Sequence, residues 1–221
     1  METHISSLSD ALIDGMSFAG RNTASYITAR KSTSFQTQSL GIFSPANLRI
    51  MRFNMADSEG AWMDGSVLRF AMTINNTGTS NLTPNTNSPS SMFRRVRLLV
   101  GGTEIYDLLD YGIVHQMMTM QLPAARLMED AIEGWGATNT ASTDPSTLCH
   151  PFTAAPIANG TGRRVLCQIL CPFFSQGKML PLSPLGSCVL EIELGGYDDC
   201  FTTGTNITNL WEIQRPVISR M

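Results

Sequence analysis

Charged residues are scarce in this chain of 221 residues: Asp, Glu, Lys and Arg make up only 15% of it, against about 25% in ordinary soluble domains. Lysine is nearly absent, with Lys31 and Lys178 the two examples, so most of the positive charge is arginine. Arginine is the better suited of the two to desolvated contacts at protein interfaces. The net charge of −3 offers no field that would attract nucleic acid, and so weakly charged a surface favours association between copies.

Long apolar runs and a signal peptide are also missing. No stretch of eighteen apolar residues occurs, which argues against a transmembrane segment. The N-terminal segment METHISSLSDALIDGMSFAG carries acids and has neither a basic start nor a long apolar centre, so we expect no secretion. Five cysteines, an odd number without an export signal, favour free thiols in a reducing compartment.

Alternating hydrophobicity begins at Ser32 and predicts strands. In SVLRFAMTI, one face carries Leu68, Phe70, Met72 and Ile74, which is the period-2 pattern of a half-buried strand. Similar patterns occur in TSFQTQSLGIF, NLRIMRFNM, RRVLCQILC, CVLEIEL and NLWEIQRPVI. Helices do not alternate with the roughly eight predicted strands, so we expect a mainly β fold, an antiparallel jelly-roll β-sandwich.

The domain organisation follows from where this pattern stops and starts. Residues 1–31 lack it and predict a partly mobile N-terminal arm. Residues 32–221 predict a single jelly-roll domain with a helical insertion at about 107–134. Within that insertion, DLLDYGIVHQMMTMQL and AARLMEDAIEGW are apolar at helical spacing, the first through Leu108, Leu109, Ile113, Met117 and Met120.

The segment FRRVRLLVGGTEIYDLLDY, residues 93–111, predicts a β-hairpin that leads into this helix. Gly101 and Gly102 supply the positive φ angles of a tight primed turn between two β-patterned runs. In the first run the inward residues are Val96, Leu98 and Val100, and the outward ones are Arg95 and Arg97. A phosphate-binding loop is disfavoured because the pattern GxxxxGK[ST] and any nearby lysine are missing.

Three acids in the same segment raise the question of a metal site. We expect Glu104 in a strand and Asp107 at the start of the helix, with Asp110 three residues further on. Acids near a helix N-terminus are favoured by capping and by the helix dipole. Capping, or pairing with the arginines, therefore explains these acids without a metal ion.

No other group of residues predicts a chemical site. Cys167 and Cys171 share an inward face and have no second pair at zinc-finger spacing, so we expect buried free thiols. No GxSxG motif occurs, and none of the three histidines is placed beside a nucleophile: His4, His115 and His150. The cluster of Met117, Met118 and Met120 predicts core or interface packing. We expect no catalytic, cofactor-binding or metal-binding residues, no cofactor, and a protein that is not an enzyme.

The order of these segments resembles a known family. The strand SVLRFAMTI, an Asn/Ser/Pro loop, SMFRRVRLLVGGTEIYDLLDYGIVHQMMTM and PFFSQGKMLPLSPLGSCVLEIEL are similar to the first jelly roll of the double jelly-roll major capsid proteins. That lineage includes adenovirus, tailless membrane-containing phages, virophages and large DNA viruses of eukaryotes. Phe93–Tyr111 and Leu180–Leu194 carry most of the resemblance.

The resemblance implies a structural shell subunit that self-assembles into capsomers of an icosahedral shell. It would be made in the host cytoplasm or nucleus and found in the virion. Its partners would be copies of itself, neighbouring capsomers and minor capsid proteins. In the family, two jelly rolls stand side by side and three copies form a capsomer. This chain has room for one jelly roll, and the trimer is expected from the resemblance alone.

Two other functions of jelly rolls are open at this point. A carbohydrate- or ligand-binding module would use Trp62, Trp135 or Trp211 as a stacking platform. A cupin-type metalloenzyme would need two or three convergent histidines on strands, which the sequence does not supply.

Overall fold

The computed structural model describes residues 32–56, 62–65, 68–84, 88–119, 121, 136–138, 149–154, 156–175, 179–201 and 209–220. The predicted N-terminal arm, 1–31, and the second predicted helix, 124–135, lie outside these residues. Eight strands form the two main sheets: β1 Thr33–Gln36, β2 Ile50–Asn54, β4 Leu68–Asn76, β5 Phe93–Val100, β6 Thr103–Leu109, β9 Gly162–Cys167, β11 Cys188–Leu194 and β12 Trp211–Arg220. The remaining elements are β3 Trp62–Asp64, β10 Met179–Pro181, β7 Gly136–Thr138, β8 Cys149–Ala154, the 3-10 helix η2 Pro89–Met92, α2 Tyr111–Thr119 and α5 Leu182–Leu185.

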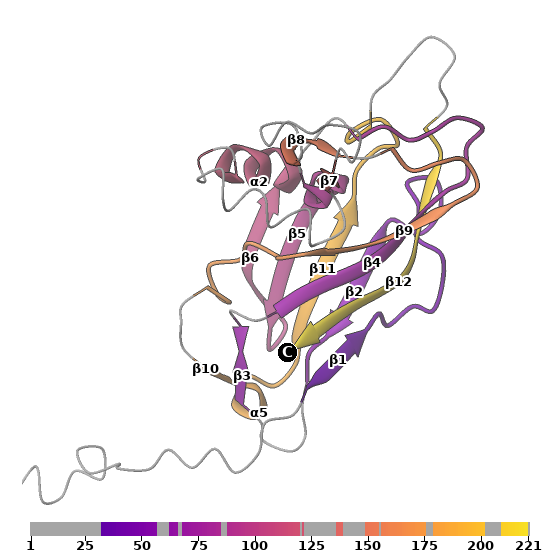
Figure 1. The fold of residues 1–221 in the computed structure, drawn as a ribbon. Helices are drawn as coiled ribbons and strands as arrows, with labels where there is room; N and C mark the ends of the chain where they lie inside the picture. The colour runs from indigo at the N-terminus through magenta and orange to yellow at the C-terminus, as the bar shows by residue number, and fades with distance from the viewer. Residues whose placement is uncertain are drawn as a thin grey trace, which may run out of the picture. The chain divides into compact units, whose positions relative to one another are not determined.

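The strand order defines a jelly roll. The first sheet has the order β1-β12-β4-β9 and the second has the order β2-β11-β5-β6, with every neighbouring pair antiparallel. Only the β5–β6 hairpin joins consecutive strands within one of these sheets, and each other connection crosses from one sheet to the other (Figure 1). Such crossing connections between two antiparallel sheets are the jelly-roll arrangement. The predicted fold class is therefore confirmed.

The core fills the space between the two sheets. Phe70 of the first sheet makes edge-to-face contacts with Phe53 and Phe93 of the second, with ring centroids 5.6 and 5.3 Å apart. The predicted inward face of β4 is confirmed by its buried side chains: Leu68, Phe70, Met72 and Ile74. Because these residues alternate along a strand, their burial follows from the period-2 pattern alone.

The predicted hairpin between β5 and β6 is confirmed. Gly101 and Gly102 form the turn with φ angles of 58° and 83°, which glycine adopts at little cost because it has no Cβ. Val96 and Leu98 of β5 are fully buried, as expected for the inward face, whereas Val100, the third residue predicted on that face, is only partly buried. The register pairs Val100 with Thr103 across the turn.

The predicted start of the helix is wrong. Asp107 to Leu109 belong to β6, and α2 begins only at Tyr111. Pairing with β5 extends as far as Leu109, which lies opposite Arg95, so tertiary hydrogen bonding holds these residues extended despite their helical spacing. Asp110 then turns the chain with a φ of 54°, and its carbonyl accepts hydrogen bonds from the amides of Ile113 and Val114.

The predicted apolar face of the helix is also wrong. The buried side chains of α2 are Tyr111 and His115, one turn apart, whereas Ile113 and Met117 are 62% and 61% exposed. Tyr111 lies against Phe93, with ring centroids 6.3 Å apart, and so fixes which face of the helix is turned inward. Gly112 permits this approach, because a Cβ at that position would lie 2.7 Å from the Ser91 carbonyl oxygen.

Candidate functional site

The three acids of the hairpin do not converge. Glu104 and Asp107 lie in β6, and Asp110 lies in the turn before α2. Asp107 accepts two hydrogen bonds from one guanidinium, that of Arg95, at 2.7 and 2.5 Å. This pairing lowers the pKa of Asp107 and raises that of Arg95. The helix-cap interpretation of Asp107 is wrong, and its pairing with arginine is confirmed.

A charged network on the second sheet was not predicted. Glu191 of β11 lies between Arg52 of β2 and Arg97 of β5 in the register of the sheet. Oε1 of Glu191 lies 2.5 Å from Nε of Arg52, and Oε2 lies 2.5 Å from a guanidinium nitrogen of Arg97. Only 8% of the Glu191 side chain is exposed, against 53% for Arg52 and 27% for Arg97. The alternation in CVLEIEL predicts that Glu191 lies on the face opposite the apolar one. Only the pairing of β11 with β2 and β5 places an arginine on each side of it.

The cysteines are buried thiols. Four cysteine side chains are described, none of them forms a disulfide, and all are buried: Cys167, Cys171, Cys188 and Cys200. Burial raises the pKa of Cys188 to about 11 and raises those of Cys171 and Cys200 as well. A thiol with a raised pKa is a poor nucleophile and a poor metal ligand at neutral pH. The expectation for Cys167 and Cys171 is confirmed, although Cys171 lies four residues beyond the end of β9.

The histidines do not form a common site among the described side chains. His115 lies on α2 and is 8% exposed, His150 falls in β8 with its side chain outside the described part, and His4 lies in the undescribed 1–31 segment. Within the described residues, no group of three or more His, Cys, Asp or Glu side chains is placed to hold a metal ion. The same part of the chain contains no helix long and apolar enough to span a membrane.

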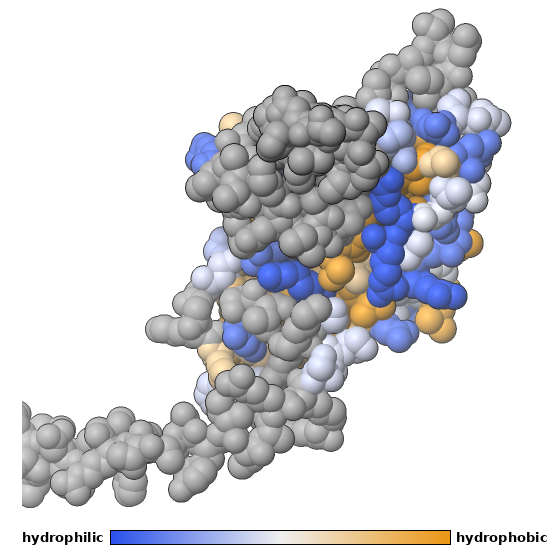
Figure 2. All heavy atoms as spheres, viewed as in Figure 1, coloured by the Kyte–Doolittle hydropathy of each residue, from blue (hydrophilic) through white to orange (hydrophobic). Residues whose placement is uncertain are grey.

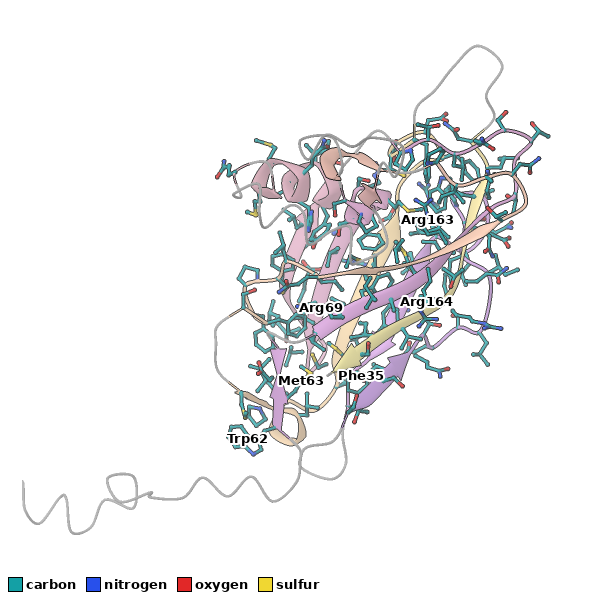
Figure 3. All side chains as sticks on the ribbon, viewed as in Figure 1. Phe35, Trp62, Met63, Arg69, Arg163 and Arg164 are labelled. Carbon is teal, nitrogen blue, oxygen red and sulfur yellow. The ribbon has the colours of Figure 1, made fainter. Side chains whose placement is uncertain are left out.

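The two tryptophans that the structure describes, Trp62 and Trp211, do not form a stacking platform. Trp211 is 1% exposed and donates from its indole nitrogen to the Tyr197 carbonyl, so it is a core residue. Trp62 is 56% exposed on the short strand β3 and lies away from the main sheets, whereas the adjacent Met63 is fully buried (Figure 3). Trp135 lies outside the described residues. Because Trp211 is buried, it is not available to stack against a carbohydrate, as the ligand-binding alternative requires.

The outward face of the first sheet carries polar and apolar side chains. Arg69 and Thr73 belong to β4, and Arg164 of β9 lies beside Thr73 in the register of the sheet. Ala71 lies on the same face of β4, opposite Leu166, and is only 3% exposed. Figure 2 shows hydrophilic and hydrophobic residues side by side in this view, and Figure 3 labels Arg69 and Arg164.

Several exposed apolar side chains lie on β6 and α2, and others lie between residues 40 and 50. We use the name β6–α2 surface for five of them: Ile105 and Leu109 of β6, 47% and 55% exposed, and Ile113, Met117 and Met118 of α2, 62%, 61% and 55% exposed. The core prediction for Met117 and Met118 is wrong, and their role in an interface stays a prediction. The strand β6 is also the last in its sheet, so its outer edge has no strand partner among the described residues. Exposed apolar groups at a sheet edge are typical of a surface that contacts another chain.

Comparison with solved structures identifies the fold. The chain is similar to one in the cryo-EM structure of the Sputnik virophage, with a TM-score of 0.51, 11% identity, and coverage of 91% of this chain and 50% of that one. It is also similar to a chain of the PBCV-1 virus capsid, with a TM-score of 0.54, 13% identity, and coverage of 90% and 44%. Those are double jelly-roll capsid proteins, and the predicted resemblance to them is confirmed for the fold.

The chain spans half or less of the length of these two capsid chains. No protein-family model matches the sequence, and no curated protein matches it.

Proposed function

We propose that this chain, which has the jelly-roll fold of the double jelly-roll capsid proteins, is a structural subunit of a virus shell that assembles with copies of itself. The observation that carries the proposal is the strand order of the two sheets together with its match to capsid chains over about nine-tenths of this chain. Its place would be the virion, after synthesis in the host cytoplasm or nucleus. A shell subunit of this kind needs no catalytic centre.

The β6–α2 surface is the contact that we propose between copies. Burying apolar side chains yields roughly 25 cal/mol for each Å² removed from water, and five such side chains lie exposed on two consecutive elements. The partner that fits is a second copy of this chain, because the low content of charged residues leaves little repulsion between copies. A trimer, the order implied by the family resemblance, is the oligomer to test first. Neighbouring capsomers and minor capsid proteins are the further partners we propose.

Light scattering coupled to size-exclusion chromatography, followed by electron microscopy, tests self-assembly. We expect a discrete oligomer at accessible protein concentrations, with rings or shells visible in the images. A protein that stays monomeric over the whole concentration range would contradict the proposal.

A charge-insertion pair tests the β6–α2 surface itself. The double variant Ile113→Glu/Met117→Glu places two carboxylates on exposed positions of α2, so we expect it to fold normally and to lose the oligomer. Leu40→Glu is the matched control, because Leu40 is 91% exposed and lies outside the surface. Equal loss in both variants, or in neither, would show that copies do not meet through β6 and α2.

A further inference from the structure

A hollow of about 460 Å³ lies beside the start of α2. Its walls come from four segments that are distant in the sequence: the residue before β2, the start of β5, the first turns of α2 and the loop after β11. Backbone hydrogen bonds join three of these segments, because the Leu194 amide donates to the Arg49 carbonyl and the Gly195 amide donates to the Met92 carbonyl. The volume lies within the range of about 300–1,000 Å³ that is typical of small-molecule sites.

Four charged side chains line the hollow, two of each sign: Arg49, Arg94, Asp110 and Asp199. Arg94, Asp110 and Asp199 are exposed and Arg49 is half-buried, so a molecule in solvent can reach them. No ion pair between described residues joins either arginine to either aspartate. Arg49 donates to one backbone carbonyl at 3.3 Å, and Asp199 accepts from one backbone amide. The charges of Arg94 and Asp110 are therefore not compensated within the folded chain.

Irregular backbone positions hold these two side chains at the hollow. In the pairing of β5 with β11, successive residues of β11 lie opposite Phe93 and Arg95, so Arg94 has no residue opposite it. A β-bulge of this kind re-aims a side chain that regular alternation would direct elsewhere. Asp110 has a φ of 54° between β6 and α2. Bulges and left-handed residues other than glycine are both enriched beside binding sites and active sites.

We propose that the hollow binds a small dipolar molecule that carries both a carboxylate and an ammonium group, such as an α-amino acid with an apolar side chain. The carboxylate pairs with Arg94 and Arg49, and the ammonium group pairs with Asp110 and Asp199. A ligand with a single charge is attracted by one pair of side chains and repelled by the other, whereas a dipolar ligand is attracted by both. Ile113, which is 62% exposed and also lines the hollow, offers a contact for the apolar side chain of the ligand. This site belongs to the single folded chain and does not rest on the proposed function.

L-phenylalanine, 3-phenylpropanoate and 2-phenylethylamine are the probes that test the proposal, because they share the ring and differ in the charges that they carry. An NMR titration of the purified full chain at pH 7 and low salt measures the three affinities. We expect L-phenylalanine to bind about threefold to fivefold more tightly than either analogue, the ratio that one exposed ion pair supplies. Equal affinities for the three probes, or no binding of L-phenylalanine at millimolar concentrations, would overturn the proposal.

Two variants assign the ends of the ligand. Arg94→Gln keeps a long polar side chain at an exposed position, and asparagine tolerates the positive φ of position 110, so Arg94→Gln and Asp110→Asn should both keep the unfolding midpoint of the wild type. In Arg94→Gln we expect the affinity for L-phenylalanine to fall to that of the wild type for 2-phenylethylamine. In Asp110→Asn we expect it to fall to that of the wild type for 3-phenylpropanoate.

Arg164→Gln is the matched control, because Arg164 is an exposed arginine of the first sheet and does not line the hollow. This variant should bind L-phenylalanine as tightly as the wild type does. An equal loss of affinity in Arg94→Gln and Arg164→Gln would show general attraction to positive charge and refute the site. Unchanged affinity in the folded Arg94→Gln protein would refute it as well.

Discussion

Replacement of Glu191 by Gln should destabilise the second sheet, although Glu191 lies on its outward face. Gln has almost the same shape and keeps one carbonyl oxygen, but it removes the negative charge that Arg52 and Arg97 share. Two guanidinium groups then face each other across β11 with no carboxylate between them. The substitution therefore isolates the electrostatic part of the network from its packing.

The magnitude follows from how exposed each partner is. A hydrogen bond to a charged group contributes about 1.5–3 kcal/mol, and the value falls toward about 1 kcal/mol or less where a partner is well hydrated. Arg52 is half exposed, so we assign about 1 kcal/mol to its contact with Glu191. Arg97 is 27% exposed, but the Glu191 Oε2 that faces it accepts no hydrogen bond from the described residues, so we count this contact as an ion pair of about 1 kcal/mol. We therefore expect Glu191→Gln to lower the free energy of unfolding by about 2 kcal/mol.

Urea denaturation measures this change directly. With a slope of about 2 kcal/mol/M, the midpoint should fall by about 1 M. A double-mutant cycle of Glu191→Gln with Arg97→Met, which keeps most of the apolar stem, should give a coupling of about 1 kcal/mol. A Glu191–Arg97 coupling below about 0.5 kcal/mol, the limit of additivity, would refute the reasoning.

Three further predictions concern the turn, the buried histidine and the thiols. Gly102→Ala should lower the free energy of unfolding by about 1 kcal/mol, because alanine disfavours the positive φ at this position, and Gly102→Asn should lower it by less. No neighbour lies within 4 Å of an added Cβ, so the cost would come from the backbone angle alone. Equal urea midpoints for Gly102→Ala and the wild type would contradict this explanation. Because the pKa of His115 falls from 6.5 to about 4 on folding, the unfolded state binds more protons between these values. Stability measured by urea titration should therefore decrease as the pH falls through this window, by up to about 3 kcal/mol, and less so in His115→Phe; identical pH profiles would contradict this. In a Cys149→Ser background, a thiol reagent at pH 8 should label the folded protein slowly and the urea-unfolded protein fully, since burial raises the pKa of Cys188 and two other thiols; rapid labelling of the folded protein would count against buried thiols.

Local chemistry made part of the fold predictable. The faces of β4 and β5 follow from alternation, because successive side chains of any strand point to opposite sides. The turn at Gly101 and Gly102 follows from their position between two β-patterned runs, because only glycine accepts positive φ at both corners without strain. These features depend on residues close in the chain, and the structure confirms them.

The candidate sites were less predictable, for a physical reason that each example shows. Asp107 occupies a helix-like sequence but pairs with Arg95, because β5 holds it in an extended strand. Trp211, a candidate platform from its residue type, is buried beside Tyr197. His115, for which the sequence offered no role, is buried because α2 packs its ring beside Tyr111, with centroids 5.7 Å apart, and no spacing in the sequence encodes that packing.

By itself, the sequence determined that this chain builds an antiparallel β-sandwich, where its hairpin turns, and which strand faces form the core. Those properties arise from period-2 burial and from the backbone freedom of single residues, which act over a few positions. Only the tertiary structure decided the strand order, the burial of Glu191 between two arginines, the exposed apolar residues of α2 and the charged hollow beside α2. These depend on which distant segments become neighbours, and that is set by packing across the whole domain.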